Sequence, residues 1–455
     1  MSRIAIRGGR VVSSHGIREV DVLIVDGVVE RVGCDLDDGV DRTIDATSCL
    51  VLPGVIDAHT HPVYLDDLES LPVTAAHGGV TTIIHYAYAK PGSGLLETIR
   101  QFREEAEAVS ILDFALHGGL FDPANQSSEI PAAIREGVTS FKMFMTYAKL
   151  GWMTDDYQLM RTLDIAGRAG GMGIVHAENG LATDYLQDRG LEAGADPKET
   201  FLDTRPAILE AEAIHRAIAM AQVAGCSLYV AHMTAALGVD EVARARAKGF
   251  RVYAETCPQY LTLTHDDLLA QGPLLKIGPP LREASDRNAL WHALAEGTID
   301  AIASDHAAKA KTREDAFFDA PYGTPQVETM LPLVFSEGVR SDRIDLPRLV
   351  RTMCENPARI FGLYPKKGVL EPGSDADLVI FDPKSEWTIR HEDQHSRALY
   401  CAYEGRSCVG RPVLTMQRGD VLVEEGGMEA RPGRGMYHPT SSGRVTLDEL
   451  ARTQG

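Results

Sequence analysis

The 455-residue sequence has no uninterrupted apolar run that approaches the roughly 20 residues needed to span a membrane. Its N-terminus, MSRIAIRGGRVVSSHG, lacks the apolar core of a secretory signal peptide. Seven cysteines are scattered through the chain without a CxxC pair or a zinc-finger spacing. An odd, scattered set of cysteines suits buried thiols in a reducing compartment. These absences predict a cytoplasmic protein without a membrane segment.

Basic residues are scarce relative to acidic ones: 45 Lys and Arg against 65 Asp and Glu give a net charge of −20. This balance argues against nucleic acid and anionic membranes as partners. It does not exclude an anionic substrate, because a metal site sets its own local field. With 44% apolar and 24% charged residues, the composition is that of an ordinary globular protein. The length allows one large domain with a smaller one.

Both ends of the chain carry short segments in which apolar and polar residues alternate. Residues 4–32 show this pattern, with turns expected at Gly8-Gly9 and Asp26-Gly27. The pattern returns in ADLVIF (376–381) and PVLTMQRGDVLV (412–423). Both regions are therefore predicted to form short antiparallel strands.

Two such β segments flanking a long α/β stretch predict one small β-sandwich domain, formed by residues 1–52 and 366–425. Within the second segment, a turn is expected at Gly419-Asp420. The Gly-, Pro- and Ser-rich tail at 426–455 carries a short predicted helix at 447–452. A free end and an oligomer contact are both open for this tail.

Between these ends, over residues 53–365, short apolar runs alternate with helical segments. The runs lie at 81–87, 113–118, 140–145, 173–178, 227–232, 251–256 and 301–306. Apolar residues at helical spacing mark, for example, 97–108, 155–169 and 210–224. With the apolar stretch at 51–62, the runs make eight βα units. Eight units over about 250 residues are typical of a (β/α)8 TIM barrel.

The stretch at 51–62, VLPGVIDAHTHP, ends in His59-Thr60-His61. Residues i and i+2 of a strand point to the same face, so His59 and His61 would project together. Two imidazoles on one face can hold a metal ion. An HxH step alone is weak evidence, because two unrelated histidines give the same pattern.

Other metal-competent residues fall in or near the ends of the predicted barrel strands, where such barrels place their chemistry. The full set is His59, His61, Lys142, His176, His232 and Asp305. Any one of them has an ordinary structural explanation. Their convergence on one rim favours a metal site, and four histidines with an aspartate and a lysine suggest two ions.

Lys142 is the unusual member, because an ammonium group cannot ligate a cation. Burial beside two metals would lower its pKa, and a neutral amine can react with CO2 to form a carbamate. That group is anionic, has two oxygens and can bridge two metals. An ion pair between Lys142 and Asp305 is the structural alternative.

A two-metal site can lower the pKa of a bridging water and polarise the carbonyl under attack. Asp305 is predicted to transfer a proton to the leaving nitrogen. Tyr147, five residues after Lys142, is predicted to donate to the oxyanion, although it could equally be a packed tyrosine. Zinc suits these ligands, while Mn²⁺, Co²⁺ and Fe²⁺ fit the same geometry.

The strings PGVIDAHTHP, FKMFM, VHAEN, VAHMT and ASDH resemble the amidohydrolase superfamily and its cyclic amidohydrolases. FKMFMTY, RPAILEAEAI, AETCPQYL and PPLR are similar to dihydropyrimidinases and hydantoinases, which open cyclic ureides and imides to N-carbamoyl amino acids. The resemblance, over roughly residues 3–425, implies a homotetramer or homodimer. It assigns His59, His61 and Asp305 to one metal, His176 and His232 to the other, carbamylated Lys142 to the bridge, and Tyr147 to the oxyanion.

Three positions differ from proteins that the chain resembles. Dihydroorotases carry an arginine where this chain has Val63, which argues against that activity. Family members commonly have a serine at the position of Gly278 and an asparagine at that of Tyr322. Both positions are predicted to contact the substrate, so allantoin or another cyclic imide remains an alternative substrate. A non-catalytic dihydropyrimidinase-like interaction protein is a further alternative, although such proteins typically lack some of the metal ligands.

Two loops are expected to choose the ring substituent. They carry Val63, Tyr64 and Leu65 after the first barrel strand, and Leu150 and Trp152 after the fourth. An apolar gate for an aryl or alkyl group and simple packing of these residues on one another are both open.

Overall fold

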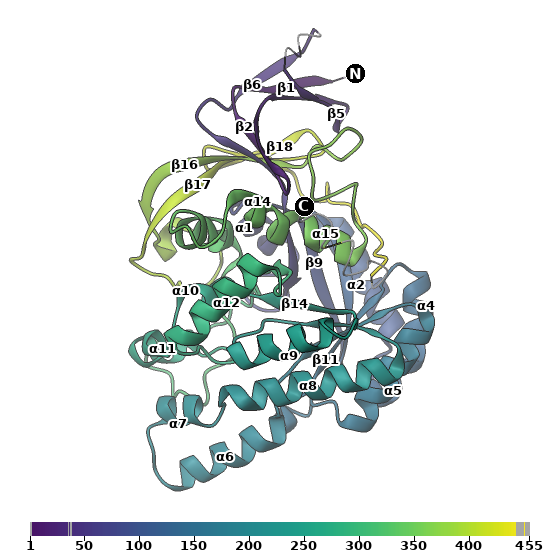
Figure 1. Cartoon of the computed structure of the whole chain (residues 1–455), viewed down its shortest axis with the longest axis vertical. Coiled ribbons are helices and arrows are strands. Elements are labelled where there is room, and N and C mark those ends of the chain that lie inside the picture. The colour runs from purple at the N-terminus through teal and green to yellow at the C-terminus, as the bar shows by residue number, and fades with distance from the viewer. Residues whose placement is uncertain (1, 35, 37–38, 443–449, 451–455) are drawn as a thin grey trace.

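A barrel and a smaller β region make up the computed structural model, which describes residues 2–34, 36, 39–442 and 450. In Figure 1 the purple N-terminal strands and the yellow-green C-terminal strands lie together at one end, and the barrel occupies the other. The two ends of the sequence thus meet in one β region, as the alternating segments predict.

The barrel is an eight-stranded parallel sheet in which the strands follow one another in chain order from β8 to β15. The strands are β8 (Val55–Thr60), β9 (Val80–Ala89), β10 (Asp113–Leu120), β11 (Ser140–Phe144), β12 (Met172–His176), β13 (Ser227–Val230), β14 (Val252–Thr256) and β15 (Ala301–Ile302). A parallel bridge between Thr60 and His306 brings the last unit beside the first. The predicted (β/α)8 architecture is confirmed.

Helices follow the strands and cover the barrel. The longer ones are α2 (Leu95–Val109), α5 (Asp156–Ala169), α6 (Gly180–Glu192), α8 (Ala207–Ala224), α9 (Ala236–Arg246) and α12 (Ala284–Glu296). The shorter ones are α1 (Ser70–His77), α3 (Pro123–Gln126), α4 (Ile130–Arg135), α7 (Pro197–Asp203), α10 (Pro258–Thr262), α11 (His265–Gln271), α13 (Met330–Val334), α14 (Leu346–Val350) and α15 (Asn356–Phe361). In α5, for example, the Asp155 side chain accepts from the N–H of Gln158 at the start, and Gly170 at φ 80° ends the helix.

The small β region contains two sheets, with strand orders β5-β4-β1-β6 and β19-β18-β17-β16-β7-β2-β3. Their bounds are β1 (Arg3–Arg7), β2 (Arg10–Ser13), β3 (Gly16–Glu19), β4 (Asp21–Val25), β5 (Val28–Gly33), β6 (Arg42–Asp45), β7 (Leu50–Pro53), β16 (Leu378–Thr388), β17 (Ser407–Gln417), β18 (Asp420–Glu424) and β19 (Gly427–Met428). The sheets share one core, to which Ile6 and Ile24 contribute from the first, and Ile380 and Met416 from the second.

Three local expectations differ from the structure. Gly8-Gly9 does not close a hairpin, because β1 and β2 belong to different sheets and the chain crosses between them. The C-terminal turn lies at Arg418-Gly419, both with positive φ, one residue earlier than expected. The apolar stretch at 51–62 is two strands: β7 pairs with β16, and β8 enters the barrel. Gly54 joins β7 to β8, and a larger residue would not fit there because its Cβ would overlap the Thr81 side chain.

The described part of the C-terminal tail runs across the N-terminal ends of β10 and β11 of its own chain. His438 N–H donates to Phe114 O, and Thr440 N–H donates to Gly137 O. Leu450 is buried with residues of the barrel interior. The rest of the helix expected at 447–452 lies outside the described residues, and a role of the tail in an oligomer stays a prediction.

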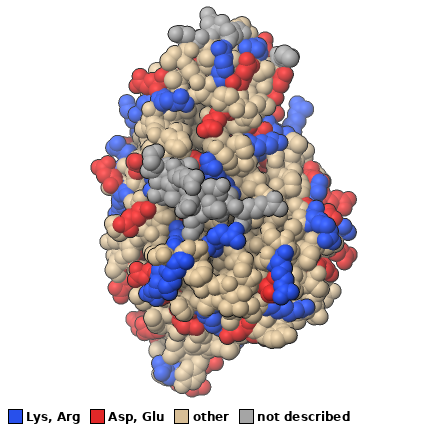
Figure 2. Space-filling model, turned by 45° about the vertical axis from the view of Figure 1, so that its right-hand side comes forward, with Lys and Arg blue, Asp and Glu red and all other residues tan. Residues whose placement is uncertain are grey.

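Acidic and basic side chains are interspersed on the face of the molecule seen in Figure 2. None of the described helices combines the length and apolar character needed to cross a lipid bilayer.

Candidate active site

The structure brings the six predicted metal-binding residues together at the carboxyl ends of the barrel strands. His59 lies near the end of β8 and His61 just beyond it, Lys142 is in β11, His176 ends β12, His232 follows β13, and Asp305 follows β15. All six line one pocket of about 330 Å³. His59, Lys142, His176 and His232 are buried, and His61 and Asp305 are partly accessible.

His59, His61 and Asp305 form a compact group of donor atoms. The Nε2 atoms of the two histidines lie 3.2 and 2.8 Å from Asp305 Oδ1. On the far side of the His59 ring, Nδ1 lies 2.6 Å from Glu255 Oε1 and donates its hydrogen to this buried carboxylate. This contact leaves the Nε2 lone pair facing Asp305, which is how a supporting carboxylate orients a metal-binding histidine. The donor set and its arrangement therefore fit a divalent metal ion.

His176 and His232 form the neighbouring pair, with ring centroids 4.4 Å apart. His176 Nε2 lies 2.7 Å from Glu178 Oε2, so its Nδ1 is the ring nitrogen free to face the pocket. Lys142 Nζ is 3.5 Å from His232 Nε2. It makes no ion pair with Asp305 among the described residues, which contradicts the structural alternative for this lysine. Burial lowers the pKa of Lys142 to about 8, so a neutral amine is accessible.

Backbone strain is concentrated at this rim. Among the residues that the structure describes, eight non-glycine residues have positive φ, and three of them are Tyr147 at 66°, His232 at 38° and Asp305 at 50°. The other five lie in turns. Such conformations persist only where the surrounding structure holds them, and they gather at functional sites. This observation marks the same residues as the motif analysis, on independent grounds.

Aromatic side chains line much of the pocket. Phe121 stacks on both Tyr88 and Trp152, at centroid distances of 4.8 and 4.7 Å. Tyr147 packs edge-on against His176 at 5.1 Å and against Tyr322 at 5.4 Å. Burial raises the pKa of Tyr147 well above its usual value, so the hydroxyl stays a hydrogen-bond donor. Of the two substituent loops, Tyr64, Leu150 and Trp152 line the pocket.

Comparison with known proteins identifies the chain. Residues 50–422 match the amidohydrolase family. The chain belongs to the amidohydrolase family. It is 39% identical to a D-hydantoinase of Geobacillus stearothermophilus, over 95% of each chain. It superposes on a dihydropyrimidinase from Brevibacillus agri NCHU1002 with a TM-score of 0.92 at 35% identity, covering 97% of this chain and 100% of the other. An L-hydantoinase (dihydropyrimidinase) from Arthrobacter aurescens gives 0.91 at 35% identity, with 96% and 99% covered.

Gly278 and Tyr322, where this amidohydrolase departs from its family's motif, also line the pocket and are neighbours. A Cβ on Gly278 would lie 2.6 Å from the Tyr147 hydroxyl and 3.2 Å from the Tyr322 ring. The Tyr322 hydroxyl accepts a hydrogen bond of 3.3 Å from Arg205. The glycine and the tyrosine therefore fit one another, and the serine common in the family would disturb Tyr147.

Sequence reasoning missed the residues that support the predicted metal-binding histidines. Glu255 receives hydrogen bonds from His59 Nδ1, the Tyr229 hydroxyl and the His232 N–H. A glutamate inside the apolar run RVYAET was the available signal, because a fully buried carboxylate needs partners. Glu178 follows His176 by two residues in the string VHAEN, and proximity to a predicted ligand could have indicated it.

A second group of metal-competent side chains in this amidohydrolase comprises Asp113, Asp375 and His438. Lys367 already fills it, with Nζ 2.5 Å from Asp113, 2.9 Å from Asp375 and 2.7 Å from Asp377. The ammonium group takes the place of a cation, so this cluster is an ion-pair junction between the barrel and the small β region.

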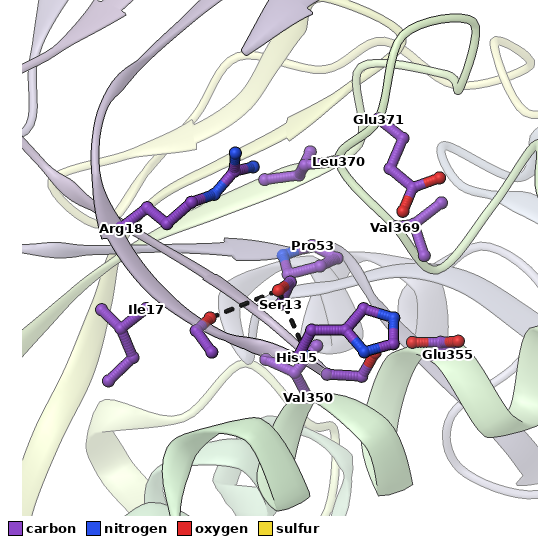
Figure 3. A pocket seen from close by; sticks show the side chains of 12 residues that line it. Ser13, His15, Ile17, Arg18, Pro53, Val350, Glu355, Val369, Leu370 and Glu371 are labelled. Atoms are coloured by element: carbon purple, nitrogen blue, oxygen red, sulfur yellow. Dashed lines mark hydrogen bonds between the residues drawn. The ribbon is translucent and has the colours of Figure 1, made fainter. Parts of the chain in front are cut away.

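A separate cavity of about 310 Å³ lies where the small β region meets α14. Figure 3 shows the His15 ring facing Glu355, with Arg18 and Leu370 farther along the wall. It contains none of the predicted site residues.

Proposed function

We propose that this amidohydrolase hydrolyses the amide C–N bond of a hydantoin, a dihydropyrimidine or a related cyclic ureide, giving an N-carbamoyl amino acid. The observation that carries the proposal is the convergence of His59, His61, Asp305, His176, His232 and Lys142 on one pocket. The D-hydantoinase and dihydropyrimidinase relatives, similar over nearly their full lengths, support the same reaction. Cyclic amides are the substrate class.

Two divalent ions are the proposed cofactors. His59, His61 and Asp305 would hold one ion, and His176 and His232 would hold the other. Addition of Lys142 Nζ to CO2, with formation of an N–C bond and loss of a proton, would give a carbamate whose two oxygens complete the donor set. The low accessibility of Lys142 and the burial that lowers its pKa to about 8 support this modification. When bound, the ions acidify a water molecule and polarise the carbonyl group.

Asp305 is proposed to transfer the proton, and Tyr147 is proposed to stabilise the negative charge that develops on the carbonyl oxygen. A carboxylate oxygen of Asp305 accepts a proton from the attacking water and transfers it to the ring nitrogen as the C–N bond breaks. The Tyr147 hydroxyl donates to the carbonyl oxygen as charge develops there. Gly278 and Tyr322 contact the ring beside Tyr147, and they are the positions that would alter the choice of ring.

Metal content and ring opening, measured on one sample, test the proposal. Elemental analysis should give about two metals per chain, with turnover of hydantoin or dihydrouracil that a chelator abolishes. Turnover of allantoin or succinimide alone would keep the site and change the substrate. Protein without metal and without turnover, purified without chelator, would support the interaction-protein alternative.

Histidine variants make this test specific. His59→Ala should lose metal and turnover together. His215→Ala, on the exposed face of α8 and paired with Glu241, is the matched control and should keep both. Loss of metal in both variants would point to general destabilisation.

The identity of the metal, the oligomeric state, the cellular compartment and the domain division are also part of the proposal. Zinc is the proposed metal, with Mn²⁺, Co²⁺ or Fe²⁺ as alternatives on the same donors. A homotetramer or homodimer is supported by exposed apolar residues on α6, Leu181 and Tyr185. Seven free cysteines support the cytoplasm. The domain division is 1–52 with 366–425, 53–365, and the tail at 426–455.

A further inference from the structure

Three lysines gather at one wall of the active-site pocket in a chain whose net charge is −20. Lys276 follows the turn at Gly272–Leu275, and Lys309 and Lys311 lie on the loop after β15. Lys276 and Lys309 line the pocket directly, and Lys311 is buried behind it. The loop after β15 therefore places Lys309 in the same pocket as Asp305, and Lys276 joins it from another loop.

Among the described residues, none of the three lysines makes an ion pair at short range, although Asp319 and Asp315 act on Lys276 and Lys311 from farther away. No carboxylate among the described residues lies within 4.0 Å of their Nζ atoms. Asp319, also in the pocket wall, is exposed and beyond that distance. Charges this far removed from water are normally paired with an opposite charge. Burial lowers the pKa of Lys276 and of Lys309 to about 8 and lowers the pKa of Lys311 further, so Lys276 and Lys309 carry the positive charge of this wall near neutral pH.

Two of these lysines have a structural task. Lys276 Nζ donates to the carbonyl groups of Phe318 and Ala320 at 2.7 and 2.6 Å. Lys311 Nζ donates to the carbonyl groups of Lys276 and Pro321 at 3.1 and 3.4 Å. These bonds hold the loop that carries Tyr322.

Lys309 differs, because no hydrogen bond to its Nζ is present among the described residues. The ammonium group lies over the ring of Tyr64, 2.8 Å from its centroid. Leu65 N–H donates to Ala308 O at 3.0 Å, which joins the loops that carry Tyr64 and Lys309. Lys309 is four residues beyond Asp305, and both line the same pocket. The donors of Lys309 are available to a ligand.

We propose that the pocket selects cyclic amides whose ring substituent ends in a carboxylate, and that Lys309 is the residue that pairs with it. The inference rests on the proposed function and names its substrate class. Lys276, also in the pocket wall, adds to the positive field at this contact, and the Tyr64 ring lies against the Lys309 ammonium group. The aromatic wall of Tyr88, Phe121 and Trp152 packs on the apolar part of the substituent.

The test compares two substrates of nearly equal shape: hydantoin with a 2-carboxyethyl group on carbon 5, and the corresponding carboxamide. Wild-type kcat/KM should favour the carboxylate by at least about tenfold, the size of one hydrogen bond to a charged group. The preference should fall as salt is raised, because the pocket mouth is open to solvent. Equal kcat/KM for the two substrates would overturn the inference without any variant.

Lys309→Met identifies the residue responsible, because methionine keeps an unbranched apolar stem against Tyr64 without the charge. The ratio of the two kcat/KM values should fall to about one. Lys309→Arg should retain a preference for the carboxylate. Lys384→Met removes the same charge from an exposed position on β16, and its ratio should match the wild type. An unchanged ratio in Lys309→Met would reject the role of Lys309.

Unsubstituted hydantoin separates this inference from the proposed function. A wild-type protein that opens hydantoin but does not distinguish carboxylate from carboxamide disproves only the substituent site. A metal-loaded protein that opens none of the three rings disproves the proposed function.

Discussion

His306 donates its Nε2–H to Asp66 over 2.9 Å, and both side chains are fully buried. The other ring nitrogen, Nδ1, accepts the backbone N–H groups of Gln326 and Val327 at 3.1 and 3.2 Å, which fixes the tautomer. Because His306 follows Asp305, this network holds the backbone on one side of the strained aspartate. The pair is a positioning element for the proposed metal site.

Asp66→Asn should destabilise the protein by about 2–4 kcal/mol, because one carboxylate now satisfies several buried donors. Its oxygens accept from His306, from the Ser396 hydroxyl and from the Arg397 N–H, and an amide offers a single acceptor atom. Urea unfolding measures the loss of stability. Turnover should fall as well, because Asp305 loses its support.

Asp67→Asn is the matched control for this variant. Asp67 is the next residue, but its carboxylate pairs with Arg397 at the surface. It also accepts from the N–H groups of Glu69 and Ser70, which asparagine does equally well. Its free energy of unfolding should stay within about 0.5 kcal/mol of the wild type. Equal losses in both variants would contradict the special role of Asp66.

Ionisation of Asp66 should make the free energy of unfolding depend on pH. Burial opposes its ionisation, but hydrogen bonds from His306, Arg397 and Ser396 outweigh burial and lower the pKa of Asp66 to about 2. In the unfolded chain the carboxyl titrates near its usual value of about 3.9. Its stabilising contribution is therefore complete above about pH 4 and is lost as the pH falls toward 2.

Urea unfolding at pH 5, 4 and 3 checks this dependence. The difference in unfolding free energy between wild type and Asp66→Asn should be smaller at pH 3 than at pH 5. A difference that stays constant or grows on acidification would contradict this role of the Asp66 carboxylate.

The sequence predicted the parts of the site that follow from strand periodicity. His59 and His61 share a face because strand side chains alternate, and Asp305 meets them because all parallel strands end at one rim. The eight barrel strands were predicted because short apolar runs alternate with helical segments along the chain. These features depend on local pattern and on the rule that closes a barrel.

Long-range contacts could not be predicted in this way. Glu255 supports His59 across 196 positions, and Asp66 meets His306 across 240. Gly278 and Tyr322 come from separate loops, so their fit depends on loop shape and not on periodicity. The crossing of the chain between two sheets at Gly8-Gly9 was also not predicted, because the same turn residues serve a hairpin and a connection between two sheets.

Lys142→Ala should lower metal content below two per chain and reduce turnover by at least about a hundredfold, if a carbamate bridges the ions. Added small carboxylates such as acetate should restore part of the activity by replacing the missing oxygens. Metal analysis and turnover with and without acetate measure both effects.

Two further lysine variants serve as comparisons for the metal content and turnover of Lys142→Ala. Lys142→Arg retains the positive charge but cannot form the carbamate, so it should behave like Lys142→Ala. Lys149→Ala removes an exposed lysine of the neighbouring loop, which pairs with Asp188, and should retain metal and turnover. Near-normal turnover in Lys142→Ala or Lys142→Arg would show that the carbamate assignment is wrong.

Gly278→Ala tests the fit between this residue and Tyr147. The added Cβ would lie 2.6 Å from the Tyr147 hydroxyl, so the hydroxyl must move away from the carbonyl oxygen it is proposed to contact. We expect kcat to fall by about tenfold to a hundredfold with KM less affected, because a donor that acts in the transition state is displaced. Tyr147→Phe removes the hydroxyl and should cost about a hundredfold to a thousandfold.

The double variant decides between displacement of Tyr147 and a general disturbance of the pocket. In Tyr147→Phe the hydroxyl that would collide with the new methyl group is absent, so Gly278→Ala should have little further effect on kcat. Such non-additivity is expected only for residues that act through one another. Fully additive losses in kcat would mean that Gly278→Ala acts elsewhere, for example through Tyr322, whose ring lies 3.2 Å from the added atom. Measuring kcat for the wild type, both single variants and the double variant closes this cycle and assigns the role of Gly278.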